Sequence, residues 1–343
     1  MDRFWKTKNV LVTGASGFVG GHLTIRLLRC GASVTVLNHH RISPPSLLAD
    51  PPVRSKITEA ITGDISNSRF IHRLFKTRRF DFCFHLAAQP LVDVANSDPT
   101  PSFDVNIKGT WNILEATRQN PLDGLLLLST SHVYGDNQTP FLEEYFPRPS
   151  RPYETSKACA DMLAQTYANY YSLPIAIARC VNLYGPGDQN ARLIPKTIRL
   201  LLQNKRPEVY RDDAVRDYMY IDDAVSAFMI LTQKVKALRN KNRNIIYNFG
   251  TGKHYSVSHI VQKIIAIFDQ PAIKPIMGGK RRQEIGEQYV SISKAMRRLG
   301  WHPQYSLREG LLATIHWYQS QRQFAHHLQG RRGADPHLIP CAF

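Results

Sequence analysis

Two residues of the segment RPYETSK, Tyr153 and Lys157, have side chains that could together perform acid–base chemistry. On a helix, residues i and i+4 share one face, so the phenol and the ammonium would lie close together. A phenol is a poor base at its usual pKa of about 10. A neighbouring positive charge favours the phenolate, which can then accept a proton near neutral pH. The pair therefore predicts a catalytic tyrosine whose pKa Lys157 lowers.

A glycine-rich turn with the spacing G-x2-G-x2-G precedes this pair in the sequence. It follows a short apolar run and opens a helical pattern. Glycines let such a turn bend tightly and let backbone N–H groups approach a pyrophosphate at a helix N-terminus. We therefore expect the turn to bind a dinucleotide through Gly14, Ser16, Gly17, Phe18, Val19 and Gly20.

Further cofactor contacts are expected where later strands end. An acidic residue usually ends the second strand and bonds the adenosine ribose, but here that place holds Asn38, followed by His-His-Arg. Asparagine can bond a 2′-hydroxyl without repelling a 2′-phosphate, so NAD and NADP both remain open. Asp64, followed by Ile65, is placed to bond the adenine or else to cap a turn. The small residues of Leu86-Ala87-Ala88 either let the backbone approach a cofactor or serve packing alone.

The first half of the chain alternates short apolar runs with amphipathic helical patterns, which predicts a parallel, doubly wound α/β sheet. Ligands bind such sheets beyond the carboxyl ends of the strands. The expected strands are residues 10–13, 34–37, 60–62, 81–86, 125–129 and 175–179. The expected helices are residues 19–29, 66–76, 103–119 and 153–171.

The second half of the chain is less regular and indicates a smaller α/β lobe that binds substrate. Helices are expected at 194–202 and 256–268, and Ser306-Leu-Arg-Glu309 forms a capping box that opens a last helix to about 321. We therefore divide the chain into a dinucleotide-binding domain at 1–186, a substrate lobe at 187–323 and a loose basic tail at 324–343. This division leaves open that some strands of the lobe belong to the sheet of the first domain.

Composition limits the classes of protein that fit. The 343 residues carry a formal net charge of +17, yet the Lys and Arg residues are scattered, so binding to nucleic acid is not favoured. No apolar run is long enough for a membrane span. The five cysteines are dispersed and lack zinc-site spacing, which favours reduced thiols in a cytoplasmic protein and no metal.

The motifs together resemble the extended short-chain dehydrogenase/reductase family, and within it the nucleotide-sugar epimerases, dehydratases and decarboxylases. The resemblance runs from about residue 9 to 321. It implies a Rossmann domain, tightly bound NAD(P) and a substrate that is a sugar linked to a nucleoside diphosphate. The motifs that carry it are GASGFVG, GDI, HLAA, STSHVYG, YETSK, NLYGP and RDY.

The resemblance also implies roles for individual residues. Tyr153 would take the proton of the sugar O4 while a hydride leaves C4 for the nicotinamide, Lys157 would bond the nicotinamide ribose, and Thr130 would share the hydroxyl proton. The remaining substrate contacts would come from Ser131, Asn182, Arg192, Arg216 and Arg282, although each arginine could instead be a surface charge. Family members pair as homodimers through helices corresponding to 103–119 and 153–171, which here carry apolar residues beyond one stripe, including Ile113, Leu114, Met162 and Leu163.

The residues after Thr130 depart from the family's dehydratases, which carry Asp-Glu or Ser-Glu where this chain has Ser131-His132. The missing carboxylate favours a 4-epimerase, because epimerisation needs only hydride transfer at C4. Neutral imidazole can act as a base at pH 7, so a 4,6-dehydratase that uses His132 is the alternative. The basic charge motivates a third hypothesis, a non-catalytic member of the fold that binds NAD(P) or RNA.

Overall fold

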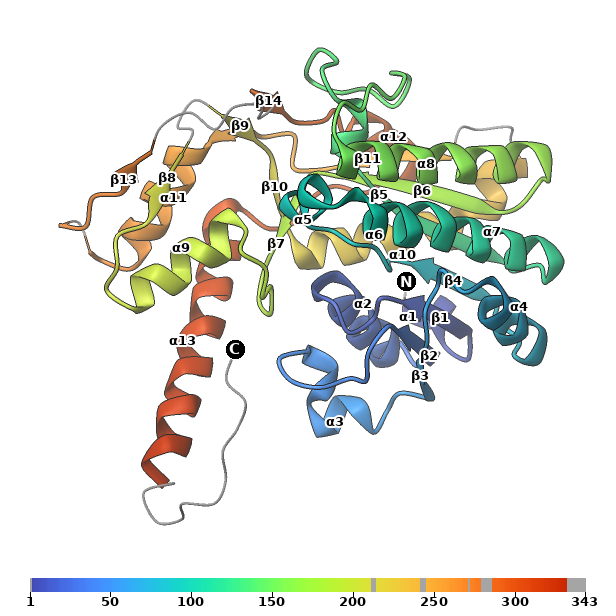
Figure 1. Cartoon of the computed structure of the whole chain (residues 1–343), viewed down its shortest axis with the longest axis horizontal. Helices are drawn as coiled ribbons and strands as arrows, with labels where there is room; N and C mark the ends of the chain where they lie inside the picture. Colours follow the sequence, from blue (N-terminus) through green and yellow to red (C-terminus); the bar gives the residue numbers. More distant parts are fainter. Residues whose placement is uncertain (1, 211–213, 241–244, 271, 279–285, 332–343) are drawn as a thin grey trace.

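The computed structural model describes residues 2–210, 214–240, 245–270, 272–278 and 286–331 (Figure 1). A seven-stranded parallel sheet forms its centre, in the order β11-β6-β5-β4-β1-β2-β3. Successive strands are added on one side of β1 as far as β3 and then on its other side from β4 onward, which confirms the predicted doubly wound Rossmann architecture. The strands are β1 Asn9–Thr13, β2 Ser33–Asn38, β3 Glu59–Thr62, β4 Phe82–His85, β5 Gly124–Thr130, β6 Ile175–Cys180 and β11 Ile246–Phe249.

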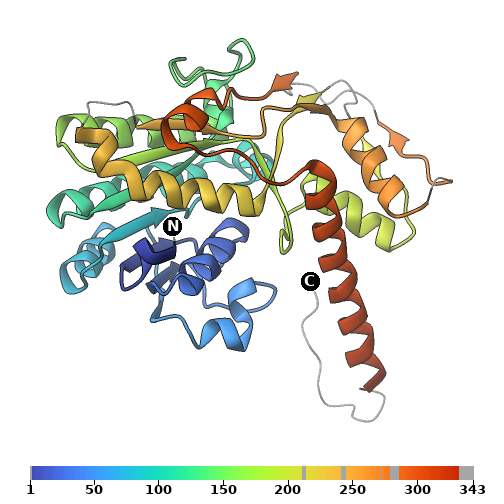
Figure 2. The same ribbon diagram turned by 180° about the vertical axis from the view of Figure 1, so that it is seen from behind.

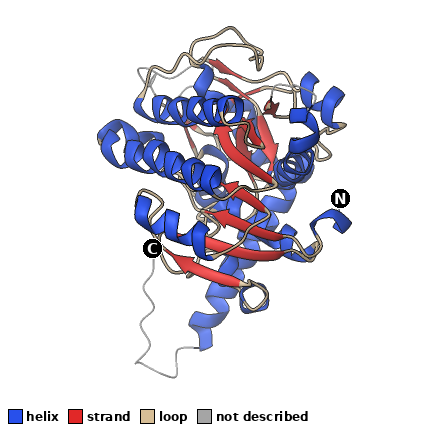
Figure 3. Cartoon of the chain, turned by 90° about the vertical axis from the view of Figure 1, so that its right-hand side faces the viewer, coloured by secondary structure: helices blue, strands red, loops and turns tan. Residues whose placement is uncertain are grey.

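Alternate residues of the central strands enter two separate cores, because successive side chains of a strand point to opposite faces. Val10 and Val12 pack with Leu23 of α2 (Phe18–Arg29), whereas Leu11 belongs to a second core with Ile71 of α4 (Ser68–Thr77). Figure 3 shows the strands between helices on both sides. Both faces being covered explains why the strands read as continuous apolar runs.

Helices α7 (Thr110–Gln119) and α8 (Pro152–Tyr170) cover the same face as α4, and α10 (Ile221–Asn240) lies on the other face beside α2. Figure 2 shows α10 running along the sheet. The predicted helix at 103–119 is interrupted by a π-helical turn, η2 (Asp104–Gly109). The shorter elements are α1 Asp2–Trp5, η1 Leu47–Ala49, α3 Pro51–Arg54, α5 Val92–Ser97, α6 Pro99–Phe103 and η3 Ser131–Tyr134.

The second lobe is built from helices α9 (Leu193–Leu202) and α11 (Val257–Ile267) with several two- and three-stranded ribbons. The remaining helices are α12 Ser293–Leu299 and α13 Leu307–Arg331. The ribbon strands are β7 Asn182–Tyr184, β8 Glu208–Val209, β9 Val215–Arg216, β10 Tyr218–Tyr220, β12 Tyr255–Ser256, β13 Ile276–Met277 and β14 Glu287–Gln288. None of the described helices is both long and apolar enough to span a membrane.

Two expectations about the second half need correction. The long helix α10 was not predicted, because its buried residues, such as the consecutive Ala227, Phe228 and Met229, lie on several faces and obscure the helical period. Helix α10 and strand β11 return to the Rossmann sheet, as the sequence left open for some strands, and the division of the chain at residue 187 stays a prediction. The predicted capping box between Ser306 and Glu309 is present. The helix that it opens continues past 321 to Arg331, into the segment predicted as a loose tail.

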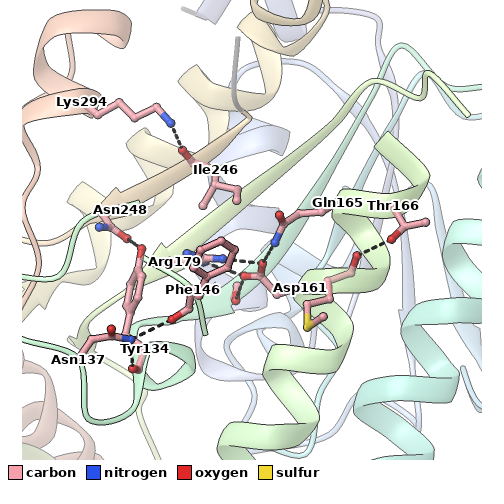
Figure 4. Close-up of polar contacts among 12 residues, drawn as sticks. Tyr134, Asn137, Phe146, Asp161, Gln165, Thr166, Arg179, Ile246, Asn248 and Lys294 are labelled. Carbon is pink, nitrogen blue, oxygen red and sulfur yellow. Dashed lines mark hydrogen bonds and ion pairs between the residues drawn. The ribbon is translucent and has the colours of Figure 1, made fainter. Parts of the chain in front are cut away.

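A buried ion pair fastens α8 to the sheet (Figure 4). Arg179 of β6 donates from Nε and Nη2 to the two carboxylate oxygens of Asp161 on α8, each at 2.9 Å, and both side chains are at most 1% exposed. Ser129 of β5 donates to the same carboxylate at 2.7 Å. The Arg179 guanidinium also lies over the ring of Tyr134, 4.8 Å from its centroid. One carboxylate therefore joins α8, β5 and β6 just beside Thr130.

We predict that Asp161→Asn destabilises the fold by about 3–5 kcal/mol, because it leaves the buried Arg179 guanidinium without a counter-charge. Urea unfolding followed by circular dichroism measures the change. The control is Glu59→Gln, which removes the partner of Arg78 in a half-exposed pair and is expected to cost at most about 1 kcal/mol. Equal, small effects of the two substitutions would show that the buried pair does not hold the fold.

Candidate active site

A cavity of about 1160 Å³ lies at the carboxyl ends of the parallel strands and extends to the second lobe. Its wall contains the glycine turn, the Tyr153–Lys157 pair and residues of α9 and β9, so it brings together almost all residues predicted for the site. Those residues are Gly14, Ser16, Gly17, Phe18, Val19, Gly20, Asn38, Asp64, Ile65, Leu86, Ala87, Ala88, Thr130, His132, Tyr153, Lys157, Asn182, Arg192 and Arg216.

One predicted substrate contact, Ser131, is not among the residues of this wall, and a second cannot be placed. Ser131 is 1% exposed and lies inside the η3 turn, so the structure does not place it in the cavity. Thr130, the residue before it, takes that place as the N-cap of η3 and accepts a hydrogen bond from the backbone N–H of His132 at 3.3 Å. Arg282 lies outside the described residues.

The glycine turn leaves no room for side chains at its first and last glycine. Gly14 has a φ of +69°, and a Cβ there would lie 2.7 Å from Cα of Ala87. A Cβ on Gly20 would lie 2.3 Å from the carbonyl oxygen of Gly14. The turn can therefore stay tight, with its backbone N–H groups at the N-terminus of α2, only if these two positions are glycine.

The end of β4 is tied to the glycine turn by the Thr13 hydroxyl, which accepts from the backbone N–H groups of Leu86 and Ala87, each at 3.2 Å. The same hydroxyl is 2.8 Å from Nδ1 of His85, whose Nε2 is 3.0 Å from the Thr110 hydroxyl. Burial, with the nearby Lys157 charge, lowers the pKa of His85 to about 3, so this histidine is a neutral structural link. The small residues after β4 thus pack directly against the turn.

Asn38 and Asp64 line the cavity, but part of each side chain is used within the protein. Oδ1 of Asn38 accepts from the backbone N–H of Ser16 at 2.6 Å, which connects the end of β2 to the glycine turn. The Asp64 carboxylate accepts from the N–H and hydroxyl of Ser66, at 2.8 and 2.7 Å. Asp64 therefore caps a turn, the alternative considered from the sequence, and contact with an adenine stays a prediction.

Tyr153 and Lys157 both line the cavity, but their electrostatics differ from the prediction. Burial raises the pKa of Tyr153, and the groups that oppose this are the charge of Arg192 and a hydrogen bond with Thr130. The Lys157 ammonium instead donates to the carbonyl oxygen of Leu128 at 2.7 Å, and burial lowers its pKa to about 8. The expected lowering of the Tyr153 pKa by Lys157 is not found among the described side chains, because the ammonium is held at β5.

Sequence reasoning did not single out Glu154, a buried carboxylate that lies beside the wall residue His132. Its side chain is 1% exposed, and one oxygen lies 3.8 Å from Nδ1 of His132, whose ring meets that of Tyr153 edge-on with centroids 5.8 Å apart. Burial by itself raises the pKa of the Glu154 carboxyl, but His132, the backbone N–H of Ser150 and the charge of Arg151 hold it below its usual value. Its position beside Tyr153 in the first turn of α8 was the available signal, although it also fits a carboxylate that merely favours a helix N-terminus.

Cationic and amide side chains of the second lobe face the same cavity. Arg216 is 8% exposed and donates to the carbonyls of Val215 and Gly286, each at 2.9 Å. Arg192 is an ion-pair neighbour of Asp188 at 3.7 Å. Asn182 donates to the carbonyl of Asp217 at 3.3 Å. Positive charge is thus present on the lobe side of the cavity, where a diphosphate would need it.

We predict that Gly20→Ala lowers the affinity for NAD and NADP roughly 10-fold or more, about 1.4 kcal/mol, because the new methyl forces the turn away from Gly14. The matched control is Gly21→Ala on the same helix, where a Cβ would make ordinary contacts, the nearest at 3.5 Å from Leu47. Fluorescence titration with both dinucleotides measures the change. If both variants bind like the unmodified protein, the turn is not the dinucleotide site.

Comparisons with known proteins agree with this geometry. Residues 10–250 match the family model described as the NAD dependent epimerase/dehydratase family. A human dTDP-D-glucose 4,6-dehydratase is 30% identical over 321 residues, which cover 91% of this chain and 90% of that protein.

Solved structures of both reaction types have the same fold. The UDP-glucose 4-epimerase of Thermotoga maritima with UDP-glucose has a TM-score of 0.82 at 26% identity, covering 92% of this chain and 99% of that one. A Streptomyces venezuelae dTDP-glucose 4,6-dehydratase with NAD bound has a TM-score of 0.81 at 26% identity, covering 92% and 98%. The sequence match, the shared fold and the glycine turn beside Thr130, Tyr153 and Lys157 together show that this chain belongs to the NAD-dependent epimerase/dehydratase family.

Proposed function

We propose that this protein is an NAD-dependent enzyme that transiently oxidises a nucleoside-diphosphate sugar at C4. The observation that carries the proposal is the cavity whose wall contains both the glycine turn and the side chains of Thr130, Tyr153 and Lys157. The membership of the NAD-dependent family supports it. Bound NAD would supply the hydride acceptor for C4, held by the turn at Gly14–Gly20 and the ends of β2 and β4.

The chain's own residues would handle the proton at O4. Tyr153 is the group that accepts it, and the Thr130 hydroxyl, which lines the same cavity, orients the sugar hydroxyl between them. Because burial raises the Tyr153 pKa, proton acceptance depends on positive charge nearby. Arg192 supplies part of it, and Lys157 stands one helical turn away. On the lobe side, Arg216, Arg192 and Asn182 are the proposed contacts of the diphosphate.

The fate of the 4-keto sugar decides the net reaction. Return of the hydride to the other face of C4 gives a 4-epimerase, and this outcome needs only Thr130, Tyr153 and Lys157. It remains the first candidate because no carboxylate follows Thr130 in the sequence. A 4,6-dehydratase is the second candidate, and the specific observation in its favour is His132 in the cavity wall with the buried Glu154 carboxylate beside it.

The protein is proposed to work in the cytoplasm as a homodimer. The cysteines of the described residues, Cys30, Cys83, Cys159 and Cys180, are all free, which supports a reducing compartment. Of the apolar residues expected at the dimer surface, Ile113 and Leu114 are instead buried in the protein's own core. The surface of α7 and α8 carries other large apolar groups, Trp111, Met162 and Tyr170, which are 53%, 57% and 80% exposed. Such a patch suits a second copy of the chain.

We predict that Tyr153→Phe lowers turnover about 10²–10⁴-fold while NAD binding is nearly unchanged, because only the proton-accepting oxygen is removed. Steady-state assays with UDP-, dTDP- and CDP-linked glucose, and fluorescence titration with NAD, measure the two quantities. The control is Tyr145→Phe, a partly buried tyrosine that does not line the cavity. A Tyr153→Phe enzyme of normal activity would remove the phenol from the mechanism.

We predict that the protein is a dimer at micromolar concentration and that Met162→Glu shifts it towards the monomer. A charge in the centre of an apolar interface carries a desolvation cost. Light scattering after size-exclusion chromatography measures the mass. The matched control is Met277→Glu, which changes an equally exposed methionine (55%) in the second lobe. A monomeric protein, or an equal response to both substitutions, would contradict the proposed surface.

A further inference from the structure

We propose that Glu154 is a positioning residue that fixes the imidazole of His132 with Nδ1 protonated towards the carboxylate, leaving Nε2 as a base for the C5 proton of a 4-keto sugar. This inference rests on the proposed function, which generates the 4-keto sugar. His132 would thus be a proton-transfer group in addition to those needed at C4. The carboxylate that supports it, Glu154, lies on α8 and not in the segment directly after Thr130.

The burial of Glu154 is the first observation. Its side chain is 1% exposed, and Ser150 donates to Oε2 from its backbone N–H at 3.1 Å and its hydroxyl at 3.4 Å. The other oxygen, Oε1, lies 3.4 Å from Nη1 of Arg151 and 3.8 Å from Nδ1 of His132. These donors stabilise the ionised form of the buried carboxylate. They also hold it in one orientation, because turning away would leave a buried charge without its partners.

The environment of the imidazole is the second observation. Nδ1 of His132 is buried and, among the described residues, has no hydrogen-bond partner. Oε1 of Glu154 lies 3.8 Å from it, so a movement of well under 1 Å would bring the two into hydrogen-bond range. The hydrogen bond that one ring nitrogen makes decides which nitrogen carries the proton. A proton on Nδ1 is therefore stabilised by the carboxylate, and Nε2 keeps its lone pair.

The third observation is the place of the ring. His132 lines the cavity, and its ring lies edge-on against that of Tyr153. A sugar whose O4 meets the Tyr153 and Thr130 hydroxyls has C5 as the next ring carbon, so C5 comes within reach of a group beside Tyr153. Arg151 also lines the cavity beside the pair, and its charge acts on the same carboxylate.

The proposed step is a proton transfer that balances without an added oxidant. The C5–H bond breaks, its proton moves to Nε2 of His132, and its electron pair forms the C4–C5 double bond of an enolate. The negative charge moves to the C4 oxygen, which the Thr130 and Tyr153 hydroxyls stabilise by hydrogen bonding. The resulting imidazolium is stabilised by the Glu154 charge, as in acid–histidine pairs elsewhere. Return of a proton from solvent to C5 then uses the electron pair of the enolate and restores the ketone at C4.

The first test reads the tautomer directly, in the full-length protein and without substrate. Nitrogen NMR of protein labelled with ¹⁵N-histidine gives the protonation of each ring nitrogen, and His132→Gln identifies the signal by its loss. We expect neutral His132 to carry its proton on Nδ1, and Glu154→Gln to shift it towards the Nε2–H form that free imidazole side chains prefer. The control, Glu144→Gln, removes an exposed carboxylate of the same segment and leaves the tautomer unchanged. A wild-type His132 protonated on Nε2 overturns the proposal.

The second test measures the chemistry. UDP-, dTDP- and CDP-linked 4-keto-6-deoxyglucose are incubated with the NAD-loaded enzyme in deuterated water, and deuterium at C5 is followed by mass spectrometry. We expect exchange that Glu154→Gln slows roughly 10-fold or more and that His132→Gln abolishes, since a general base typically contributes about 10²–10⁴-fold. Absence of wild-type exchange, or exchange insensitive to Glu154, overturns the inference.

These readouts separate the inference from the proposed function. The ready-made ketone bypasses oxidation at C4, so C5 exchange does not require hydride transfer. Reduction of bound NAD by a nucleotide sugar with an unoxidised C4 tests the proposed function alone. A protein that reduces NAD but shows no C5 exchange keeps the proposed function and loses the role of Glu154. A protein that exchanges C5 but never reduces NAD keeps the dyad and loses the proposed function.

Discussion

The Asp161–Arg179 ion pair is the constraint on which the rest of the site depends. It fastens α8 to β6, and through Ser129 it also fixes the end of β5. The residue after Ser129 is Thr130, and Asp161 stands one turn after Lys157 on α8. The Thr130 hydroxyl and the Tyr153 phenol therefore meet because a buried carboxylate sets the distance between the strand and the helix that carry them. Ordered buried charges of this kind give one arrangement instead of several.

Much of the fold was predictable because its signals are local. The six strands expected from the first half are present with shifts of one residue at their ends, since runs such as Val10–Thr13 are buried on both faces of a parallel sheet. The return of α10 and β11 to the sheet was not predictable in detail. It depends on long-range packing of a helix whose apolar residues surround it, and no periodic stripe marks that face.

The parts of the site that could be predicted from the sequence are those whose geometry follows from the spacing of residues along one element. The glycine turn and the i, i+4 pair on α8 gave the cavity's main residues. Spacing could not show that the Lys157 ammonium donates to the carbonyl oxygen of Leu128. Nor could it show that Ser131 is buried within η3 or that Glu154 lies beside His132. These outcomes depend on burial and on contacts between β5 and α8, which single positions in a sequence do not reveal. The absence of a carboxylate after Thr130 is therefore a weaker argument against a dehydratase than the sequence alone suggests, because Glu154 places a carboxylate beside His132.

Transient oxidation at C4 is the central claim, and isotope labelling at that carbon tests it most directly. A nucleotide sugar carrying deuterium at C4 is converted by the NAD-loaded enzyme in ordinary water, and the position of the label in the product is read by NMR. Because the same bound cofactor takes and returns the hydride, the label should stay in the product, at C4 after epimerisation or at C6 after dehydration. Product in which the C4 deuterium has been lost to solvent would contradict hydride transfer at C4.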